Sequence, residues 1–396
     1  MNMNEQMKES EENILHTYNR FPVVFEKGQG CYLYDSEGKE YLDFAAGIAV
    51  NSLGYHYPGY DEALKDQIDK LMHISNLYYN EPIIEAGAKL VKASKMSKAF
   101  FTNSGTEAIE GALKAAKKYA YVRDGHADHE IIAMNHSFHG RSIGALSVTG
   151  TAHYREPFEP LMGGVKFADF NDLESVKAQI TDKTCAIITE VVQGEGGIYP
   201  AKREFLEGLR QICDEKDIML IFDEIQCGMG RTGYYFAWQA YGVQPDIMTS
   251  AKALGCGVPV GAFVLSEKAA KASLEPGDHG TTYGGNPFVC AAVSKVFEIY
   301  ENDKIIEHVQ EMTPYLEQKL DEIVAKHECA ATRRGMGFMQ GIVIQGRPVG
   351  EVVKAALAKG LLVISAGSDV LRIVPPLVIT KEHIDKMASI LDECME

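Results

Sequence analysis

The sequence of 396 residues is longer than one hydrophobic core normally supports, which predicts a large domain with a smaller companion. Hydrophobic residues make up 46% and charged residues 24%, the composition of an ordinary globular protein. The net charge of −16, from 39 basic and 55 acidic residues, argues against nucleic acid or an anionic membrane surface as the main partner.

The eight cysteines form no C-x-x-C pair, which argues against a zinc ribbon and against a secreted disulfide framework. The first residues, MNMNEQMKESEEN, are polar and acidic and do not resemble a signal or transit peptide. No apolar run approaches the roughly 20 residues needed to span a bilayer. We therefore expect a cytoplasmic protein.

The predicted elements begin, after a polar N-terminal segment, with a β-hairpin over residues 31–45, where apolar residues alternate around an Asp-Ser-Glu-Gly turn. From about residue 60 to 290, short apolar runs alternate with helical patterns such as 105–120 and 203–216. The predicted strands of this part are 98–103, 130–135, 185–192, 218–224, 246–251 and 261–266. This alternation predicts an α/β fold whose mostly parallel sheet is covered by helices on both faces.

The pattern changes after about residue 290. A long helical stretch over about 287–328 precedes three apolar strands and a final helix from about 380, which predicts a smaller α+β unit. The three strands are 337–344, 360–366 and 370–379. We expect three parts: residues 1–60, packing with the small domain and a dimer partner; the large domain 61–290; and the small C-terminal domain 291–396.

Polar residues follow several of the predicted strands, at the carboxyl ends where open α/β sheets bind ligands. The first group is Ser104, Gly105 and Thr106, between strand 98–103 and a helix. Ser104 and Glu107 have the capping-box spacing, and the free amides with the helix dipole form an anion site. A plain helix cap without a ligand is the alternative interpretation.

Asp223 closes the apolar strand 218–224, where a carboxylate requires a cation or a hydrogen-bond donor. A protonated pyridine nitrogen would satisfy it, and Gln226 would then reach a phenolate oxygen. A helix cap or a structural ion pair is the alternative.

Lys252 ends the strand 246–251 and is followed by glycines. A partly buried amine has a lowered pKa and can act as a Schiff-base nucleophile. The alternative is a lysine whose ammonium reaches solvent at the strand end. A dinucleotide-binding loop is a weak interpretation, because the glycines are spaced G-x-G-x-x-x-G and Pro259 interrupts the helix that such a loop requires.

Phe138 and Arg141 follow strand 130–135. An aromatic ring there can stack on a planar ligand, and the guanidinium can fork onto a carboxylate. A phosphate site, a stacking ring, a partner for a ring nitrogen and an amine at separate strand ends together predict a site for pyridoxal phosphate.

The pairs His136/His139 and His126/His129 have spacings seen at metal sites. No further ligand cluster accompanies them in the sequence. We therefore predict that the protein has no metal site.

Six motifs are specific: FFTNSGTEA, SFHGRSIGALSVTG, EVVQGEGG, DEIQCGMGRTG, AKALGCGVP and HGTTYGGNP. With them the sequence resembles the class III aminotransferases of fold type I, almost end to end, from TYNRFPV (17–23) to LRIVPPLVI (371–379). The resemblance implies the fold of the pyridoxal-phosphate-dependent transferases, a large domain with a mostly parallel sheet and a smaller α+β domain.

The resemblance also implies the residues that hold the cofactor, pyridoxal 5'-phosphate. Lys252 would form the Schiff base, Asp223 would pair with the pyridine nitrogen, and Gln226 with the ring hydroxyl oxygen. Phe138 would pack on the ring. The phosphate ligands would be Ser104, Gly105, Thr106 and, from the neighbouring subunit, Thr282. A donated Thr282 implies an obligate homodimer with shared active sites.

Substrate residues are implied in the same way. Arg141 would clamp one carboxylate, and Arg372 would clamp the second carboxylate of 2-oxoglutarate and glutamate. Glu195 would pair with Arg372 when the amine substrate is bound. Thr281 and Tyr18 would lie near the substrate. The sequence departs from the family at Cys256, where a third glycine is common.

The implied reaction transfers the ω-amino group of N-acetylornithine to 2-oxoglutarate, in two half-reactions with ping-pong kinetics. The products would be N-acetylglutamate 5-semialdehyde and glutamate, in arginine biosynthesis. Ornithine, succinyldiaminopimelate and 4-aminobutyrate are the alternative amine donors. A non-enzymatic relative or a nucleotide-dependent oxidoreductase is the alternative from another class.

Overall fold

The computed structural model describes residues 2–396, and a seven-stranded sheet lies at the centre of its larger part. The sheet has the order β4-β12-β11-β10-β7-β5-β6. Its strands are β4 (Lys98–Thr102), β5 (Glu130–Met134), β6 (Val165–Ala168), β7 (Thr184–Glu190), β10 (Met219–Asp223), β11 (Ile247–Ser250) and β12 (Gly261–Leu265). Strand β12 runs antiparallel to β4 and β11, while the other six strands share one direction and end at one edge of the sheet. The predicted mostly parallel α/β sheet is confirmed.

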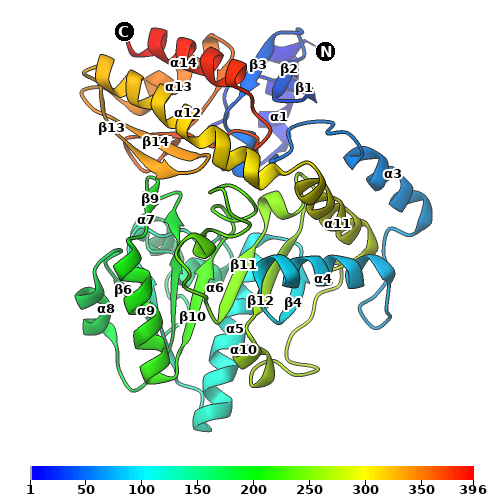
Figure 1. Cartoon of the computed structure of the whole chain (residues 1–396), viewed down its shortest axis with the longest axis vertical. Coiled ribbons are helices and arrows are strands. Elements are labelled where there is room, and N and C mark those ends of the chain that lie inside the picture. Colours follow the sequence, from blue (N-terminus) through cyan, green and yellow to red (C-terminus); the bar gives the residue numbers. More distant parts are fainter. Residues whose placement is uncertain (1) are drawn as a thin grey trace.

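Helices cover both faces of this sheet (Figure 1). Adjacent strand residues point to opposite sides: Ile132 and Ile187 belong to one buried cluster, and Ile131 and Ile188 to another. The helices of this part are α3 (Tyr60–Lys70), α4 (Glu81–Ser94), α5 (Gly105–Asp124), α6 (Ile143–Ser147), α7 (Ala152–Arg155), α8 (Leu173–Gln179), α9 (Arg203–Lys216) and α10 (Glu267–Lys271). Short 3₁₀ helices are η1 (Glu156–Phe158), η2 (Ala237–Ala240) and η3 (Lys252–Leu254).

A smaller antiparallel sheet lies above the large one in Figure 1, in the order β13-β14-β17-β16. Its strands are β13 (Ala330–Met336), β14 (Met339–Ile344), β16 (Ile364–Ala366) and β17 (Val370–Ile373). The helices after residue 286 are α11 (Pro287–Asn302), α12 (Ile305–Lys326), α13 (Val349–Ala358) and α14 (Lys381–Met395). The single stretch expected over about 287–328 is therefore two helices, broken where Lys304 adopts a φ of 54°.

The N-terminal strands join this smaller part. The elements are α1 (Met3–Asn13), β1 (Phe25–Gln29), β2 (Tyr32–Asp35), β3 (Glu40–Asp43) and α2 (Ala46–Ala49). Strand β3 pairs in parallel with β15 (Leu361–Leu362), so both chain ends lie at the top of Figure 1. The division into three parts at residues 60 and 290 stays a prediction.

A short hairpin of β8 (Val192–Gln193) and β9 (Tyr199–Pro200) carries the EVVQGEGG motif beyond β7. Within residues 2–396 no helix combines the length and the apolar character needed to cross a membrane.

Candidate active site

A cavity of about 450 Å³ lies at the edge where the six parallel strands end. Its volume falls in the range of small-molecule sites. The sequence-predicted residues that line it are Ser104, Gly105, Thr106, Phe138, Arg141, Asp223, Gln226 and Lys252. They come from the ends of four separate strands, β4, β5, β10 and β11, which lie together because the carboxyl ends of the parallel strands share one edge.

One end of the cavity is the first turn of α5. Ser104 caps this helix by accepting a hydrogen bond from the Glu107 N–H at 3.3 Å. The expected capping box is wrong in its second half, because Glu107 Oε2 accepts from the Asn103 N–H at 2.8 Å instead of from the N–H of Ser104. Among the described residues the N–H groups of Ser104, Gly105 and Thr106 have no hydrogen-bond acceptor. Three free amides at a helix N-terminus fit an anion such as phosphate.

Two glycines keep this turn open. A Cβ on Gly105 would lie 2.9 Å from the Ile225 side chain, and one on Gly140 would lie 2.3 Å from Thr106 Oγ1. Thr106 in turn exchanges a 2.8 Å hydrogen bond with Ser142. A larger residue at Gly140 would therefore displace Thr106, and one at Gly105 would push the first turn of α5 away from Ile225.

Asp223 lies at the end of β10 and is almost fully buried. His139 Nδ1 is 2.7 Å from Asp223 Oδ2, while the Ile225 N–H and Thr249 Oγ1 donate to Asp223 Oδ1 at 3.0 and 3.2 Å. These donors hold the carboxylate in one orientation against the cavity wall. His139, which also lines the cavity, is a candidate site residue that the sequence interpretation missed, since it was considered only for metal spacing.

Glu190 pairs in register with Asp223 across β7 and β10 and also lines the cavity. Burial raises the pKa of the Glu190 carboxyl well above its usual value, and the nearby Asp223 raises it further. Glu190 Oε2 has no hydrogen-bond partner among the described residues. Both effects favour the neutral form of the Glu190 carboxyl.

Lys252 follows β11 and begins η3 with a φ of 49°, in the left-handed region that costs a side-chain-bearing residue about 1–3 kcal/mol. Its Nζ forms no hydrogen bond or ion pair with any described residue. Burial lowers the pKa of the Lys252 amine, with Glu195 opposing this effect and Arg372 adding to it. An amine that has no hydrogen-bond partner and a lowered pKa is suited to attack a carbonyl.

Arg372 lies in β17 and is 3% exposed. Its Nη1 donates to Glu195 Oε1 at 2.5 Å and to Gln226 Oε1 at 3.1 Å, and its Nη2 donates to the Ser365 carbonyl at 3.2 Å. Burial alone would raise the pKa of Glu195, but the charge and hydrogen bonds of Arg372 hold it below its usual value. Gln226 therefore connects this ion pair to the cavity.

The chain matches the family described as Aminotransferase class-III over residues 14–395. The acetylornithine aminotransferase of Clostridium acetobutylicum is 47% identical over 388 residues, which cover 98% of this chain and 100% of the relative. The chain belongs to the class-III aminotransferase family. The predicted family and enzyme class are confirmed.

Two solved class-III structures have the same fold. The N-acetylornithine aminotransferase of Stenotrophomonas maltophilia is 35% identical, with a TM-score of 0.84 and coverage of 98% of each chain. The ornithine aminotransferase of Toxoplasma gondii, crystallised with oxidised glutathione, is 29% identical, with a TM-score of 0.95 and coverage of 100% and 94%. That structure has partial occupancy of PLP at its active site.

The class-III family is pyridoxal-phosphate-dependent, and the cavity of this aminotransferase fits the cofactor. The free amides at Ser104–Thr106 match the phosphate, Phe138 offers an aromatic face, and Asp223 offers a buried carboxylate. The unpartnered amine of Lys252 completes the set.

Five predicted residues of the class-III chain lie outside the cavity lining: Glu195 and Arg372, whose ion pair lies beside it, and Thr281, Thr282 and Tyr18. Thr281 is half-buried and accepts a 3.1 Å hydrogen bond from Asn103, which itself lines the cavity. Thr282 is exposed, and so is Tyr18, whose exposed fraction is 72%. The single chain thus brings Thr281 to the edge of the site but not Thr282 or Tyr18.

Cys256, the departure from the usual glycine run, has a φ of 46° and is buried. Its Sγ accepts a hydrogen bond from the Leu53 N–H at 3.3 Å. The side chain is therefore accommodated in a backbone conformation that favours glycine, through a contact with the segment after α2.

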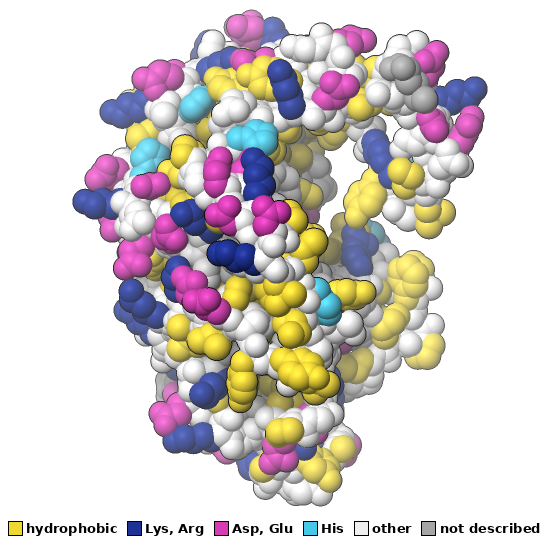
Figure 2. Space-filling view, turned by 90° about the vertical axis from the view of Figure 1, so that its right-hand side faces the viewer, with side chains coloured by type: hydrophobic (Ala, Val, Ile, Leu, Met, Phe, Trp, Pro, Cys, Tyr) yellow, Lys and Arg dark blue, Asp and Glu magenta, His cyan; other side chains and the backbone are white. Residues whose placement is uncertain are grey.

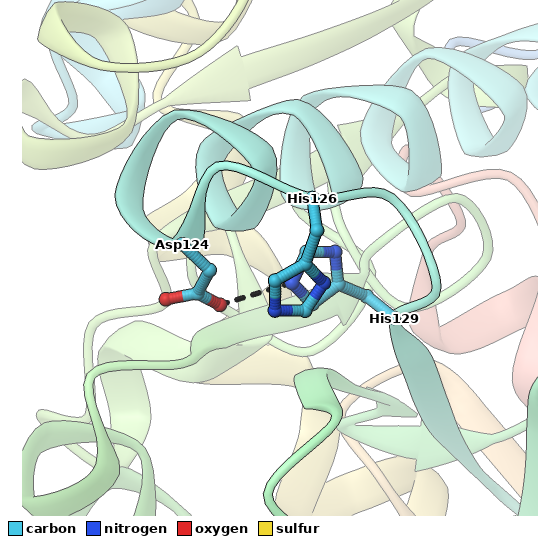
Figure 3. Close-up of side chains that lie close together, drawn as sticks. All are labelled: Asp124, His126 and His129. Atoms are coloured by element: carbon cyan, nitrogen blue, oxygen red, sulfur yellow. Dashed lines mark hydrogen bonds and ion pairs between the residues drawn. The ribbon is translucent and has the colours of Figure 1, made fainter.

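Figure 3 shows Asp124, His126 and His129, the group of described residues whose spacing could suit a metal ion. Their candidate ligand atoms lie within 4.8 Å of one another. The Asp124 carboxylate already accepts from Arg123 Nε and Nη2 at 2.6 Å each and lies 2.9 Å from His129 Nε2. A cation would have to displace the Arg123 guanidinium, so this group is better described as an ion-pair network; the absence of a metal site stays a prediction.

Proposed function

We propose that this class-III aminotransferase transfers the ω-amino group of N-acetylornithine to 2-oxoglutarate, giving N-acetylglutamate 5-semialdehyde and glutamate in arginine biosynthesis. The observation that carries the proposal is the presence of two arginines, Arg141 in the cavity lining and Arg372 beside the cavity in contact with Gln226. Arg372 is neutralised by Glu195, whereas Arg141 has no acidic partner among the described residues. The similarity to a Clostridium relative called acetylornithine aminotransferase supports this choice of substrate.

The site can offer either one or two arginines to a substrate, depending on whether Glu195 is paired with Arg372. With Glu195 in place, Arg141 alone is free for a carboxylate, which suits an amine substrate with one carboxylate. When Glu195 turns away, Arg372 becomes a second clamp, which suits 2-oxoglutarate. The specificity follows from the number of carboxylates on the substrate.

Pyridoxal phosphate, when bound, supplies an electron-withdrawing ring that stabilises a carbanion next to the transferred nitrogen. Lys252 would hold it covalently through Nζ, and Asp223, oriented by His139, would keep its ring nitrogen protonated. Lys252, once its amine is free, would move the proton at the amine-bearing carbon of the substrate. The amides of Ser104–Thr106 would fix the phosphate.

The proposal includes a homodimer in which Thr282 of one subunit reaches the phosphate site of the other. Thr282 is exposed and is followed by Tyr283, which is 61% exposed. Asn76 Nδ2 donates to the Gly284 carbonyl at 2.8 Å and so joins this loop to residues 71–79. The large apolar side chains exposed on these two segments are Leu71, Met72, Leu77, Tyr78, Tyr79 and Tyr283.

Figure 2 views the side of the molecule where α3, α4 and α11 lie and shows hydrophobic side chains spread over that surface. Exposed apolar surface of this kind supports a protein interface. A second copy of the chain would cover it and bring Thr282 to the neighbouring cavity.

The cytoplasmic location expected from the sequence belongs to the same proposal. All eight cysteines are free, and seven of them are buried. A fold that uses no disulfide suits a reducing compartment.

A panel of four amine donors with 2-oxoglutarate tests the substrate. We expect kcat/KM for N-acetylornithine to exceed that for ornithine, succinyldiaminopimelate and 4-aminobutyrate, measured as glutamate formed. A higher kcat/KM for ornithine would replace this proposal by ornithine transfer, which the likeness to the Toxoplasma enzyme supports.

Borohydride reduction tests the role of Lys252. The protein loaded with pyridoxal phosphate should be yellow, and reduction followed by peptide mapping should find the cofactor mass on the peptide that contains Lys252. Lys252→Ala should carry no fixed cofactor, while Lys177→Ala, at a surface lysine paired only with Glu174, should be fixed like wild type. Cofactor mass on another lysine would refute the assignment.

A further inference from the structure

The guanidinium of Arg141 is held by aromatic rings and not by acids. Its Cζ lies 3.9 Å from the centre of the Tyr154 ring and 5.3 Å from the centre of the Phe138 ring. Among residues 2–396 no carboxylate lies within ion-pairing distance of Arg141, and its side chain forms no hydrogen bond. The side chain is exposed, so the aromatic contacts are what orient it.

Tyr154 supplies the closer of the two contacts. It belongs to α7, and its ring meets the edge of Phe138 at a centroid distance of 6.0 Å and an interplanar angle of 82°. It also lines a second cavity, of about 790 Å³, whose wall includes Glu195. Tyr154 therefore contacts the unpaired arginine and shares the wall of this second cavity with Glu195.

An aromatic partner and an acidic partner have different consequences for an arginine. A carboxylate neutralises the guanidinium and occupies its N–H groups, as Glu195 does for Arg372. A ring face attracts the cation but leaves the N–H groups at the guanidinium edge available for another ligand. Stacking thus orients the arginine and preserves its capacity to bind a substrate carboxylate in the bidentate mode.

We propose that Tyr154 is a positioning residue that holds Arg141 for the carboxylate of the amine substrate and so selects amines that carry a carboxylate. This inference rests on the proposed function, in which Arg141 binds that carboxylate. The hydroxyl of Tyr154 forms no hydrogen bond among the described residues, so the ring face performs this role.

The test compares two amines that differ only in the carboxylate: N-acetylornithine and N-acetylputrescine. Tyr154→Leu should raise KM for N-acetylornithine about three- to thirtyfold, the range that a lost cation–π contact predicts, with kcat nearly unchanged. The kcat/KM for N-acetylputrescine should stay the same, because this amine has no carboxylate to clamp. Tyr154→Phe keeps the ring and should restore KM to within about twofold of wild type.

Two further measurements separate positioning from general damage. Arg141→Ala and the double variant with Tyr154→Leu should have the same KM for N-acetylornithine, because the tyrosine acts through the arginine. The dissociation constant of N-acetylnorvaline, which lacks the ω-amine and does not react, should rise in Tyr154→Leu by the same factor as KM when measured by calorimetry.

Two outcomes would overturn the role of Tyr154. One is that Tyr154→Leu lowers kcat/KM equally for N-acetylornithine and N-acetylputrescine. The other is that Tyr154→Leu leaves KM for N-acetylornithine unchanged while Arg141→Ala raises it. Failure of the proposed function looks different, because wild type would then prefer another donor such as ornithine. In that case the same comparison with ornithine and putrescine decides the role of Tyr154.

Discussion

Glu195 and Arg372 come from distant parts of the chain, the loop between β8 and β9 and the strand β17, and form an ion pair beside the cavity. Glu195 is the more accessible partner, with a side-chain exposure of 28% against 3% for Arg372. An accessible carboxylate can turn towards solvent, whereas the arginine is fixed by the Ser365 carbonyl and by Gln226. The mobile half of the pair is therefore the acid.

Glu195→Gln should weaken the discrimination between amine substrates. Loss of the carboxylate leaves Arg372 without an acidic partner when N-acetylornithine is bound. The ratio of kcat/KM for N-acetylornithine to kcat/KM for glutamate should therefore fall about tenfold or more, as for a lost charge-assisted hydrogen bond. Both half-reactions can be followed by the absorbance of the cofactor. Glu317→Gln, which removes one of the two acidic partners of Arg333 outside the site, is the control. An unchanged preference in Glu195→Gln would rule out the switch.

Glu224 is fully buried next to Asp223 and accepts hydrogen bonds at 2.8 Å from the N–H groups of Ala237 and Trp238. Burial raises the pKa of Glu224 from 4.5 to about 7, although these amides oppose it. Between pH 4.5 and 7 the folded state therefore binds this proton more tightly than the unfolded state. The Glu224 contribution to stability is complete below pH 4.5 and is lost as the pH rises through 7.

Glu224→Gln should change this dependence on pH. The amide of the variant cannot ionise, whereas wild type loses the stability contributed by the protonated Glu224 as the pH rises. The free energy of unfolding of the variant, relative to that of wild type, should therefore rise by up to about 3 kcal/mol between pH 4.5 and 8. Urea unfolding at a series of pH values measures the difference. Glu301→Gln, at a residue exposed on α11, should show no such trend, and a constant difference for Glu224→Gln would mean that Glu224 is ionised throughout.

Among single residues, the sequence identifies those that lie at the end of an apolar strand. Lys252 and Asp223 stand out because a charged group directly after a buried strand requires an explanation, and the structure places both in one cavity wall. His139 could not be found this way, since its contact with Asp223 spans 84 residues and exists only after the sheet has formed. The stacking of Tyr154 on Arg141 also depends on tertiary placement, because α7 is a single short turn.

Helix α5 is the element that carries the anion site, and its position depends on close packing against the sheet. A Cβ on Gly111 would lie 2.2 Å from Cε1 of the buried Phe263 in β12. The helix therefore approaches β12 more closely than any side chain at this position would allow. The amides of Ser104–Thr106 are held at the cavity by that contact.

Gly111→Ala should be destabilising even though alanine favours helices. The added methyl group overpacks the core and should cost about 1–3 kcal/mol, seen as a lower urea midpoint and weaker retention of pyridoxal phosphate. Gly350→Ala is the matched control, because Gly350 lies in helix α13 with nothing near its Cβ position. The control should be neutral or stabilised by up to about 1 kcal/mol. Equal midpoints for wild type and Gly111→Ala would show that α5 can move away from β12.

The elements that the sequence predicts best are the strands buried on both faces. Strands such as β7 and β10 are continuous apolar runs, and their expected ranges differ from the observed ones by a residue or two at each end. Strand β6 was missed because it is a four-residue edge strand with mostly half-buried residues. β13 was missed because Thr332, Arg333 and Arg334 interrupt it, so that it contains no continuous apolar run. The antiparallel direction of β12 follows from topology, which an apolar pattern does not encode.

On the scale of the whole molecule, segments that are distant in the sequence pair and hydrogen-bond with one another. Strand β3 pairs with β15, although more than 300 residues separate them, and the buried Arg231 donates at 3.3 Å to the Phe338 carbonyl beside the small sheet. Arg231 also donates to the Pro375 carbonyl. These contacts hold the smaller part of the molecule, and with it Arg372, in a fixed position beside Lys252.

The exposed loop that carries Thr282 belongs to the same scale, because Thr282 does not line the candidate active-site cavity of its own chain. A heterodimer of Lys252→Ala and Thr282→Glu subunits, co-expressed with two different tags and purified by both, tests whether Thr282 serves the neighbouring site. If it does, one site receives both defects and the other receives none, so the heterodimer should have about half the activity of wild type. Each homodimer should be inactive, because Lys252→Ala lacks the amine and Thr282→Glu brings a negative charge to the phosphate. An inactive heterodimer with intact dimer mass by sedimentation would show that Thr282 acts within its own chain, since each site would then retain one defect.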